Sequence, residues 1–577
     1  MNPTRLLAAF AAPLLLGACA TLPQSARTPD TYAAGMVSAA DPRAGEAGAQ
    51  MLRAGGSATD AALATMLALT VVEPQSSGIG GGGFLVLDDG AGHVTTYDGR
   101  EKAPMAAGHD WFYVNGQPLT TPQAIPGGRS VGVPGNVALM AKAHAEHGTL
   151  PWKALFAPAI RLARGGFAIG PRLSRALTVS AETGALSADA RALYYAPDGS
   201  ALPAGTVVRN PALARFLEAL AARGQSAFYT GANAQAIAAA VAQAPRNPAP
   251  MTTSDLATYA AKERLPVCGS YRGYRICGMG PPSSGATTVI GTLAMLERFD
   301  LHALGQSSPQ SWHLIAEAMR LAYADRERYL ADGDFVRVPT AGLVAPDYLA
   351  ARSLLISPTA TMASAAAGNP AGAPLALADT LTADVPSTSH FVAIDRRGGI
   401  ATETSTIESA FGSGLMVSGY YLNNELTDFS IVPDRAGVPV ANRVEGGKRP
   451  RSSMAPTLVY ASDGKPRLAL GAAGGATIPA QVLKAIIGVI DWGLSAQDAI
   501  ALPVLFAPGG TTLYLEKGTM LETLIPGLRA LGHSDIQPRD LPLKANAVEV
   551  VGGRLVGGAD PRSEGRAVSE QLHTGAE

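Results

Sequence analysis

The residues Pro386-Ser387-Thr388-Ser389-His390-Phe391 stand where the character of the chain changes. Residues 361–380 before them are a low-complexity run of Ala, Gly and Pro, the most linker-like part of the sequence. Residues 389–394 after them read SHFVAI and predict a β-strand. A threonine at the start of a strand is common, because threonine favours strands. Its place at the end of a linker gives Thr388 a second interpretation.

That second interpretation is a nucleophile made by cutting the chain. Cleavage of the peptide bond before Thr388 would leave a free α-amine beside the threonine hydroxyl. An N-terminal amine has a pKa of about 8, so it can take the hydroxyl proton at neutral pH. Thr388 would then be both nucleophile and base. The linker upstream would leave the other new chain end free to move away.

Ordered motifs on both sides of Thr388 resemble the γ-glutamyltransferase family, whose members are glutathione hydrolases and transpeptidases. The resemblance covers nearly the whole chain after residue 34. The matching segments, in chain order, are 72–78 (VEPQSSG), 98–101 (DGRE), 132–135 (GVPG), 281–285 (PPSSG), 422–424 (LNN), 448–454 (KRPRSSM), 474–475 (GG) and 559–562 (ADPR). Each motif is weak alone, but their joint order makes chance similarity very improbable.

The resemblance implies an α+β fold, a four-layer αββα sandwich of the N-terminal-nucleophile hydrolase type. It also implies self-cleavage between Ser387 and Thr388 by an N→O acyl shift. The products would be a large subunit of residues 35–387 and a small subunit of residues 388–577. We expect them to stay together as a heterodimer, because both supply strands to one core.

The site residues follow from what a γ-glutamyl group needs. A guanidinium binds a carboxylate through two parallel hydrogen bonds, and Arg100 matches the family's residue for this task. The turn Gly474-Gly475 can offer backbone N–H groups to an oxyanion. Thr406 matches a threonine that orients the nucleophile. The other matching positions are Ser452 and Ser453 as hydroxyl donors, and Glu408, Glu425 and Asp428 as partners of the ammonium.

The predicted reaction is cleavage of glutathione or another γ-glutamyl donor through an ester on Thr388, resolved by water, an amino acid or a dipeptide. No metal or organic cofactor is expected. Several family members carry amides where this chain has Glu408 and Glu425. Residues 429–447 correspond to a lid over the pocket, and 432–447 contain no aromatic residue. An open pocket admits water, so we expect hydrolysis over transpeptidation.

Two rival functions remain at this stage. A glutaryl- or cephalosporin-type acylase of the same fold would not need the three acidic residues that match the ammonium site. A non-enzymatic envelope lipoprotein would need neither Thr388 nor Arg100. The presence of both residues favours an enzyme, and the acidic residues favour an acyl group that carries an amine.

The N-terminus predicts export. Residues 6–18 form an apolar run after Arg5, too short to span a bilayer, which takes ~20 residues. Leu16-Gly17-Ala18-Cys19 then reads as a lipobox, so residues 1–18 are a signal peptide, Cys19 is the lipid anchor and residues 19–34 are a tether. The expected location is the periplasmic space, anchored to the outer membrane by lipid alone. An ordinary secretory signal is the alternative.

Four further observations limit the interpretation. The 45 basic and 46 acidic residues give a net charge of −1, which argues against a nucleic-acid partner. Gly78 to Gly83 match GxGxxG, but a helix pattern precedes them and a strand pattern follows, the reverse of a dinucleotide site. Cys268 and Cys277 flank a predicted hairpin, and a disulfide or two buried thiols are both open. His144 and His147 are interpreted as a solvated helix end rather than a metal pair.

Overall fold

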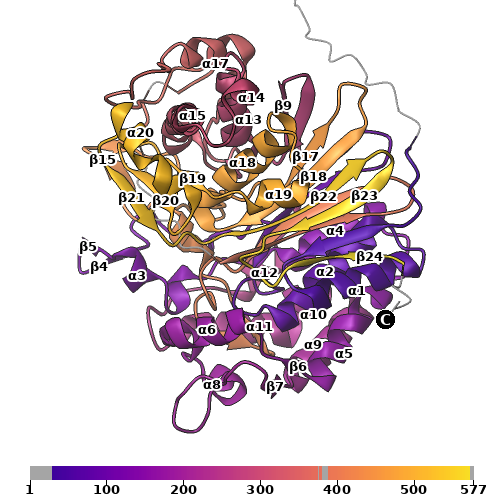
Figure 1. The fold of residues 1–577 in the computed structure, drawn as a ribbon. Coiled ribbons are helices and arrows are strands. Elements are labelled where there is room, and N and C mark those ends of the chain that lie inside the picture. The colour runs from indigo at the N-terminus through magenta and orange to yellow at the C-terminus, as the bar shows by residue number, and fades with distance from the viewer. Residues whose placement is uncertain (1–28, 375, 380–386, 572–577) are drawn as a thin grey trace, which may run out of the picture.

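The computed structural model describes residues 29–374, 376–379 and 387–571 (Figure 1). Two antiparallel sheets form its centre. The first has the strand order β24-β1-β11-β12-β2-β3-β8 and the second β23-β22-β18-β17-β10-β9. The first sheet contains β1 (Met36–Ala39), β2 (Gly82–Asp88), β3 (Val94–Asp98), β8 (Lys262–Arg264), β11 (Thr388–Ile394), β12 (Ile400–Thr406) and β24 (Arg566–Ser569). The second contains β9 (Val267–Tyr271), β10 (Tyr274–Gly278), β17 (Thr457–Tyr460), β18 (Pro466–Ala473), β22 (Lys544–Val551) and β23 (Arg554–Ala559).

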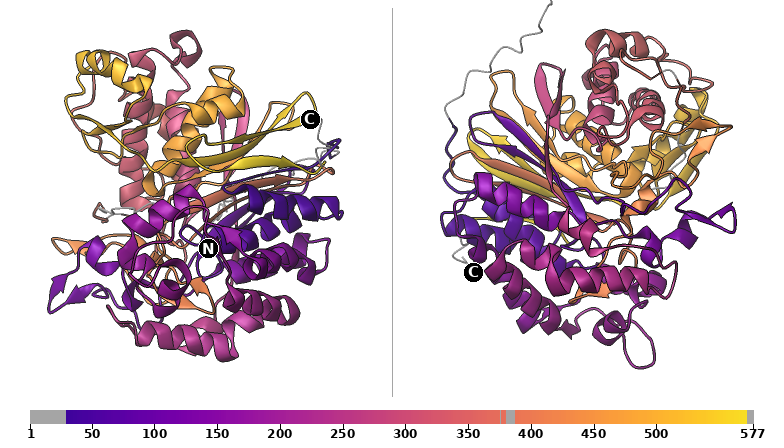
Figure 2. Two further views of the ribbon diagram at one scale, coloured as in Figure 1. Left: turned by 60° about the horizontal axis from the view of Figure 1, so that its bottom comes forward. Right: turned by 180° about the vertical axis from the view of Figure 1, so that it is seen from behind.

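Helices cover the outer faces of both sheets. The first sheet lies on α1 (Pro42–Arg53) and α2 (Ala58–Val72), and the second lies under α13 (Gly285–Leu296), α18 (Ile478–Ile490) and α19 (Ala496–Ala501). The sheets themselves pack together through β11, β12, β18 and β22. Figure 2 shows both sheets face to face between the helices. The predicted αββα layering is therefore confirmed.

The central region is mostly helical. Its longer helices are α4 (Asn136–His147), α5 (Ala157–Gly165), α6 (Pro171–Val179), α9 (Pro211–Arg223), α11 (Gly231–Ala242), α15 (Pro309–Tyr329) and α17 (Pro346–Ser353). A 3-10 turn (Trp152–Phe156) leads directly into α5, where Pro158 occupies the first turn. Within the described ranges, no helix is long and apolar enough to cross a membrane.

Helix α2 leads the chain to the glycine run before strand β2. Ser57 caps its first turn, and the Asp60 side chain accepts from the Ser57 backbone N–H in return. Every residue of α2 is buried, as expected for a helix that lies between a sheet and an outer helical layer. The helix ends at Val72, before Pro74. The following turn leads to Gly78 and the glycine run.

The glycine run lets β2 lie directly against β12. A Cβ atom on Gly81 would lie 1.9 Å from the carbonyl oxygen of Thr406, and one on Gly80 would lie 2.0 Å from that of Tyr421. No side chain fits at such distances. Strand β2 begins at Gly82, so the run opens a strand rather than a helix, and the dinucleotide interpretation is excluded.

Strand β11, which begins at Thr388, pairs with β12 over its whole length. Thr388 lies opposite Thr406, and Ile394 lies opposite Ile400. The turn that joins the strands includes Gly398 at φ 85°. Strand β11 begins one residue before its predicted start, so Thr388 belongs to the regular ladder together with Thr406. The ladder therefore fixes the two threonines relative to each other.

The two remaining cysteines form a disulfide. Cys268 on β9 lies directly opposite Cys277 on β10, with Cα atoms 4.1 Å apart, and their sulfurs are joined. The hairpin turns at Arg272 and Gly273, as predicted. Cys19 and the predicted signal peptide lie outside the described residues.

Candidate active site

The hydroxyl of Thr388 forms a hydrogen-bonded chain with its own peptide bond. Thr388 Oγ1 donates to Thr406 Oγ1 at 3.1 Å, and Thr406 Oγ1 donates to the carbonyl oxygen of Ser387 at 2.9 Å. The backbone N–H of Glu408 donates to Thr406 Oγ1 at 2.8 Å. Thr406 therefore both orients the Thr388 hydroxyl and polarises the carbonyl that a self-cleavage reaction would attack.

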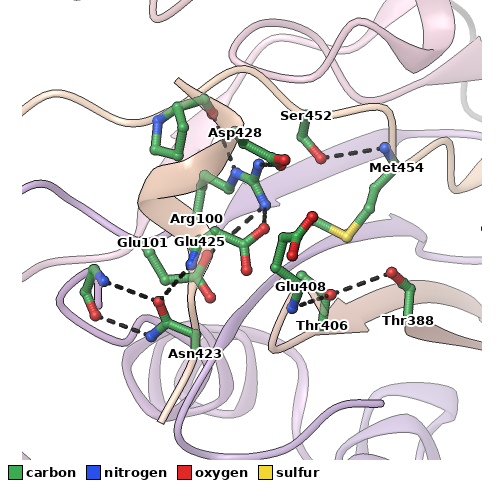
Figure 3. A network of polar contacts seen from close by, with 12 residues as sticks. Arg100, Glu101, Thr388, Thr406, Glu408, Asn423, Glu425, Asp428, Ser452 and Met454 are labelled. Carbon is green, nitrogen blue, oxygen red and sulfur yellow. Dashed lines mark hydrogen bonds and ion pairs between the residues drawn. The ribbon is translucent and has the colours of Figure 1, made fainter. Parts of the chain in front are cut away.

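A small, partly open cavity lies beside Thr388. Figure 3 shows the polar groups gathered around it. Its lining residues are Arg100, Thr388, Thr406, Glu408, Glu425, Asp428, Ser452, Ser453, Met454, Gly475 and Ile478. The structure thus brings together almost every residue that the sequence singled out. Gly474 is not part of the lining, and Ser387 lies on the other side of the peptide bond before Thr388.

The guanidinium of Arg100 is buried, and its N–H groups bond to other groups of the protein. Nη1 pairs with the Glu425 carboxylate and Nη2 with Asp428. Nε donates to the carbonyl of Pro450 at 3.1 Å, and Nη2 donates to that of Arg451 at 2.8 Å. Burial alone would lower the pKa of Arg100, but the Glu425 and Asp428 carboxylates outweigh it and raise that pKa. Arg100 is therefore a fixed cation at every working pH.

Two more carboxyl groups lie in the same region and favour their protonated forms. Burial raises the pKa of Glu408 well above its ordinary value, and the carboxylates of Asp428 and Glu425 add to the effect. Burial, followed by the Glu425 carboxyl, does the same for Glu101. With both groups protonated, Glu425 and Asp428 provide one negative charge more than Arg100 balances. The empty pocket therefore attracts a cation.

Glu408 is held in an unusual backbone conformation. Its φ is 75°, a region that favours glycine. Asn424 Nδ2 donates to Glu408 Oε2 at 2.6 Å, and Asn424 Oδ1 accepts from the backbone N–H of Ser409 at 2.8 Å. A non-glycine residue with positive φ persists only where its surroundings over-determine it. Asn424 supplies that constraint, and Glu408 lines the cavity (Figure 3).

The paired serines are fixed by a loop and a buried arginine. Arg326 Nη2 donates to Ser453 Oγ at 2.5 Å, and its Nε donates to Ser284 Oγ at 2.9 Å. Ser284 donates to the carbonyl of Ser452 at 2.7 Å. The Ser452 hydroxyl accepts from the Met454 N–H at 3.2 Å. The serines therefore have defined positions at the cavity wall.

The predicted oxyanion turn has the backbone that glycine permits. Gly474 has φ 138° and Gly475 has φ 58°. A Cβ atom on Gly474 would lie 2.2 Å from the carbonyl oxygen of Pro542. The Thr477 hydroxyl donates to the Gly474 carbonyl at 2.9 Å. The turn is thus tightly held, with Gly475 at the cavity.

The segment from Phe429 to Gly447 forms a small hairpin beside the site. Its strands are β15 (Asp434–Arg435) and β16 (Val438–Pro439), with exposed residues at the tip. No residue of this segment after Asp428 belongs to the cavity lining. Residues 432–447 contain no aromatic side chain that could cover the cavity. The expectation that hydrolysis exceeds transpeptidation rests on this observation and stays a prediction.

Metal-ligand candidates have other partners. Among the described residues, His313, Glu317 and His533 place candidate ligand atoms within 4.8 Å of one another. His313 Nδ1 lies 2.8 Å from His533 Nε2, and Glu317 pairs with Arg320 at 2.6 Å. These are hydrogen-bonded core residues beside a cation, which disfavours a metal. His144 and His147 bond separately, at 2.8 Å to Leu150 O and 2.7 Å to Tyr97 Oη, so they form no metal pair.

The sequence interpretation missed several supporting residues. Asn424 and Arg326 constrain Glu408 and Ser453, Glu101 adds a carboxyl group, and Met454 and Ile478 supply the apolar wall. Three of the five lie inside matched motifs, at 98–101, 422–424 and 448–454. Arg326 carries no such signal, because only the fold brings α15 to the serines.

Comparison with known proteins supports the family resemblance found in the sequence. The family model described as gamma-glutamyltranspeptidase matches residues 44–570. The glutathione hydrolase proenzyme of Bacillus subtilis (strain 168) is 36% identical over 93% of this chain and 92% of its own. That of Escherichia coli (strain K12) is 34% identical over 92% and 90%. A cephalosporin acylase from Bacillus halodurans superposes with a TM-score of 0.82 at 26% identity, covering 96% of this chain and 99% of its own.

Proposed function

This chain belongs to the gamma-glutamyltranspeptidase family, and from that premise we propose that it is a self-processing γ-glutamyl amide hydrolase and transferase. Glutathione is the proposed donor, as in the names of its relatives, and Thr388 is the proposed nucleophile. The fold is that of the N-terminal-nucleophile hydrolases among its structural neighbours. The carrying observation is the hydrogen-bonded chain from Thr388 through Thr406 to Ser387.

The proposed first reaction is cleavage between Ser387 and Thr388. Thr388 Oγ1 attacks the Ser387 carbonyl carbon, the C–N bond breaks, and the nitrogen of Thr388 takes the proton. Water then hydrolyses the resulting ester and leaves a Ser387 carboxylate and a Thr388 amine. Both sheets contain strands from 35–387 and strands from 388–577. These shared sheets support a heterodimer of large and small subunits.

The arrangement of charges supports an acyl group that is a zwitterion. Glu425 and Asp428 both pair with the guanidinium of Arg100. A γ-glutamyl α-carboxylate can take their place on the guanidinium, while its α-ammonium gives the two displaced carboxylates a new cation. A glutaryl group has the carboxylate without the ammonium, so it would leave buried carboxylates uncompensated, which is costly. The pocket therefore favours γ-glutamyl over glutaryl substrates.

Turnover then follows from the same residues. The Thr388 amine accepts the hydroxyl proton, and the oxygen attacks the γ-amide carbon. The Gly474 and Gly475 N–H groups are the proposed oxyanion donors, with Ser452 and Ser453 near the α-carboxylate. The leaving amine takes the proton, and water resolves the ester to glutamate. An amino acid or dipeptide acceptor would instead give a new γ-glutamyl amide. With no aromatic lid, water is the favoured acceptor.

The alternative function is a cephalosporin-type acylase, favoured by the superposition with a solved acylase. Three p-nitroanilides separate the two functions: γ-glutamyl, glutaryl, which lacks the amine, and 4-aminobutyryl, which lacks the carboxylate. We expect kcat/KM to fall roughly 10²-fold or more for glutaryl, and less for 4-aminobutyryl, because its ammonium still meets the acidic pocket. Equal turnover of the glutaryl compound would establish the acylase instead.

The direct test of the class is the mass and N-terminal sequence of the purified protein. Two fragments, one starting at Thr388, are expected. A single uncut chain without activity would support the remaining rival, a non-enzymatic envelope lipoprotein. In that case Thr388→Ala would change nothing.

We also propose export and lipid anchoring at Cys19, on the lipobox of the sequence. Metabolic labelling with a fatty acid tests this point independently of activity. The Cys19→Ser variant should lose the label and the membrane association. Label retained by that variant would exclude Cys19 as the anchor.

A further inference from the structure

A buried ion pair lies behind the nucleophile strand. Lys544 Nζ, at the start of β22, is 2.9 Å from Glu73 Oε2, at the end of α2. Both side chains are buried. Successive residues of a strand point to opposite faces, so Ser389 faces away from the side of β11 that carries the Thr388 hydroxyl. The Ser389 hydroxyl donates to Glu73 Oε2 at 2.6 Å and accepts from Lys544 Nζ at 3.3 Å.

The same network reaches the peptide bond that is proposed to be cut. Lys544 Nζ is 3.5 Å from Ser76 Oγ, and the Ser387 hydroxyl is 3.3 Å from that oxygen. Ser387 is also held by the carbonyl of Gln75 at 2.7 Å. The ion pair therefore contacts Ser389 directly and is linked to Ser387, on the other side of the bond, through Ser76.

Lys544 is tied to the glycine turn by its backbone. Its N–H donates to Gln481 Oε1 at 3.1 Å, and Gln481 Nε2 donates to the carbonyl of Ala473 at 2.8 Å. Ala473 lies opposite Lys544 in the ladder of β18 and β22, directly before Gly474. Lys544 thus connects the strand that carries the nucleophile with the turn proposed to hold the oxyanion.

Stability alone does not explain such a pair. A buried ion pair is often no better than a well-packed apolar replacement. Burial lowers the pKa of Lys544 to about 8, with Glu73 opposing the effect and Arg172 adding to it. Lys544 therefore remains mostly charged at neutral pH and can hold Glu73 and Ser389 in one arrangement.

Cleavage creates a specific need for this arrangement. It would turn Thr388 from an internal residue into a chain end, and chain ends fray unless they are tied down. Ser387 would leave with the large subunit, whereas Glu73, Ser389 and Lys544 would stay in place. The tie at Ser389 acts on the first residue after the nucleophile.

We propose that Lys544, together with Glu73, is a positioning residue for the reactions of Thr388. Through Ser389 it holds the start of β11 at a fixed separation from the Gly474-Gly475 turn, before and after cleavage. This inference rests on the proposed function, since it assigns a role in that function's two steps.

The test compares matched variants of the full chain with γ-glutamyl p-nitroanilide. Ser389→Ala removes the tie without leaving a buried charge unpaired, and Ser311→Ala is its control, because Ser311 donates to Gly305 O at 2.6 Å in another part of the fold. Lys544→Met is matched by Lys484→Met, a buried lysine that donates to Ile500 O and Leu502 O at 2.6 and 2.8 Å. Processing is followed by intact mass, and folding by thermal unfolding.

We expect Ser389→Ala and Lys544→Met to process slowly and to lose roughly 10-fold or more in kcat with KM within about twofold, since they disturb geometry rather than binding. Their effects should be less than additive in the double variant. Ser389→Thr, which keeps the hydroxyl, should restore kcat. Both controls should behave as wild type.

Wild-type kcat in Ser389→Ala, or an equal loss in Ser311→Ala, would overturn the inference. If Lys544→Met does not fold, the comparison of Ser389→Ala with Ser389→Thr still decides. A wild-type chain that neither processes nor cleaves the anilide would instead overturn the proposed function, and the inference with it.

Discussion

Thr388 and Thr406 face each other across the central strand pair of the first sheet, with their hydroxyl oxygens 3.1 Å apart. The Thr406 hydroxyl in turn donates a hydrogen bond to the carbonyl oxygen of Ser387. In the uncleaved chain the nitrogen of Thr388 is an amide and cannot act as a base. Before the amine exists, the Thr406 hydroxyl is therefore the group that orients the Thr388 hydroxyl for the proposed first cut.

Removing the nucleophile should abolish both reactions. Thr388→Ala should remain one chain and lose at least roughly 10³-fold of γ-glutamyl hydrolysis. Thr388→Ser keeps a hydroxyl and should process, although more slowly. Intact mass and anilide turnover measure the two effects. Processing of Thr388→Ala at the wild-type rate would show that another group makes the cut.

Removing the orienting hydroxyl should slow the first cut. Thr406→Val keeps the shape of the side chain but loses its contacts with Thr388 and Ser387. We expect processing to slow roughly 10- to 10²-fold, the usual range for one transition-state hydrogen bond. Thr457→Val is the matched control, because Thr457 is buried and bonds only to the Ala455 carbonyl at 2.9 Å among the contacts described. An equal delay in both variants would point to lost stability instead.

Glu408 should make substrate binding depend on pH. Its pKa is raised by burial and by Asp428 and Glu425, so it ionises only above the ordinary range of a carboxyl group. As pH rises through that pKa, the pocket gains a negative charge and KM for a γ-glutamyl donor should fall. Glu408→Gln cannot ionise, so its KM should stay flat over the same interval. Identical KM profiles for the two proteins would contradict this role.

Glu403 should lower stability as pH rises. It is buried in the middle of β12, neither carboxyl oxygen has a hydrogen-bond partner in the described chain, and burial raises its pKa to about 8. The unfolded value is about 4.3. The folded chain therefore binds the extra proton, and stability falls as pH rises from the unfolded to the folded pKa. Each unit of the difference is worth about 1.4 kcal/mol, so the loss by pH 8 is of the order of several kcal/mol.

Glu403→Gln tests this expectation, because it removes the titration without changing the size of the side chain. Thermal unfolding between pH 5 and pH 8 should show a flatter profile for the variant. Glu549→Gln on β22 is a control at a carboxylate that does have a cation partner, Arg467. A wild-type profile as flat as that of Glu403→Gln would exclude the buried acid as the cause.

The disulfide should contribute modestly to stability. Cys268 and Cys277 are nine residues apart and already adjacent in a hairpin. In the chain-entropy model, closing so short a loop lowers the entropy of the unfolded chain and thereby stabilises the folded protein by about 2–3 kcal/mol at most. The double variant Cys268→Ala, Cys277→Ala should unfold a few degrees lower with unchanged kcat. A large loss of kcat would mean that the hairpin supports the site.

The sequence by itself determined which residues are candidates for the site and which local structures carry some of them. The linker next to a strand pattern singled out Thr388, and the ordered motifs located Arg100 and the Gly474-Gly475 turn. Strand β11 and the hairpin between Cys268 and Cys277 were predictable because alternation and turn residues act between near neighbours.

Only the tertiary structure decided how the charged groups pair. Arg100 lies 325 residues from Glu425 along the chain, and Glu73 lies 471 from Lys544. Arg100 follows β3 and Glu425 lies in a 3-10 turn, whereas Glu73 ends α2 and Lys544 begins β22. Each pair exists because the tertiary packing brings these separate elements together. The same packing buries Glu403 with no hydrogen-bond partner among the described residues and places Arg326 beside Ser453. Local patterns report which face of an element is apolar, whereas the partner of a buried charge depends on how the layers are stacked.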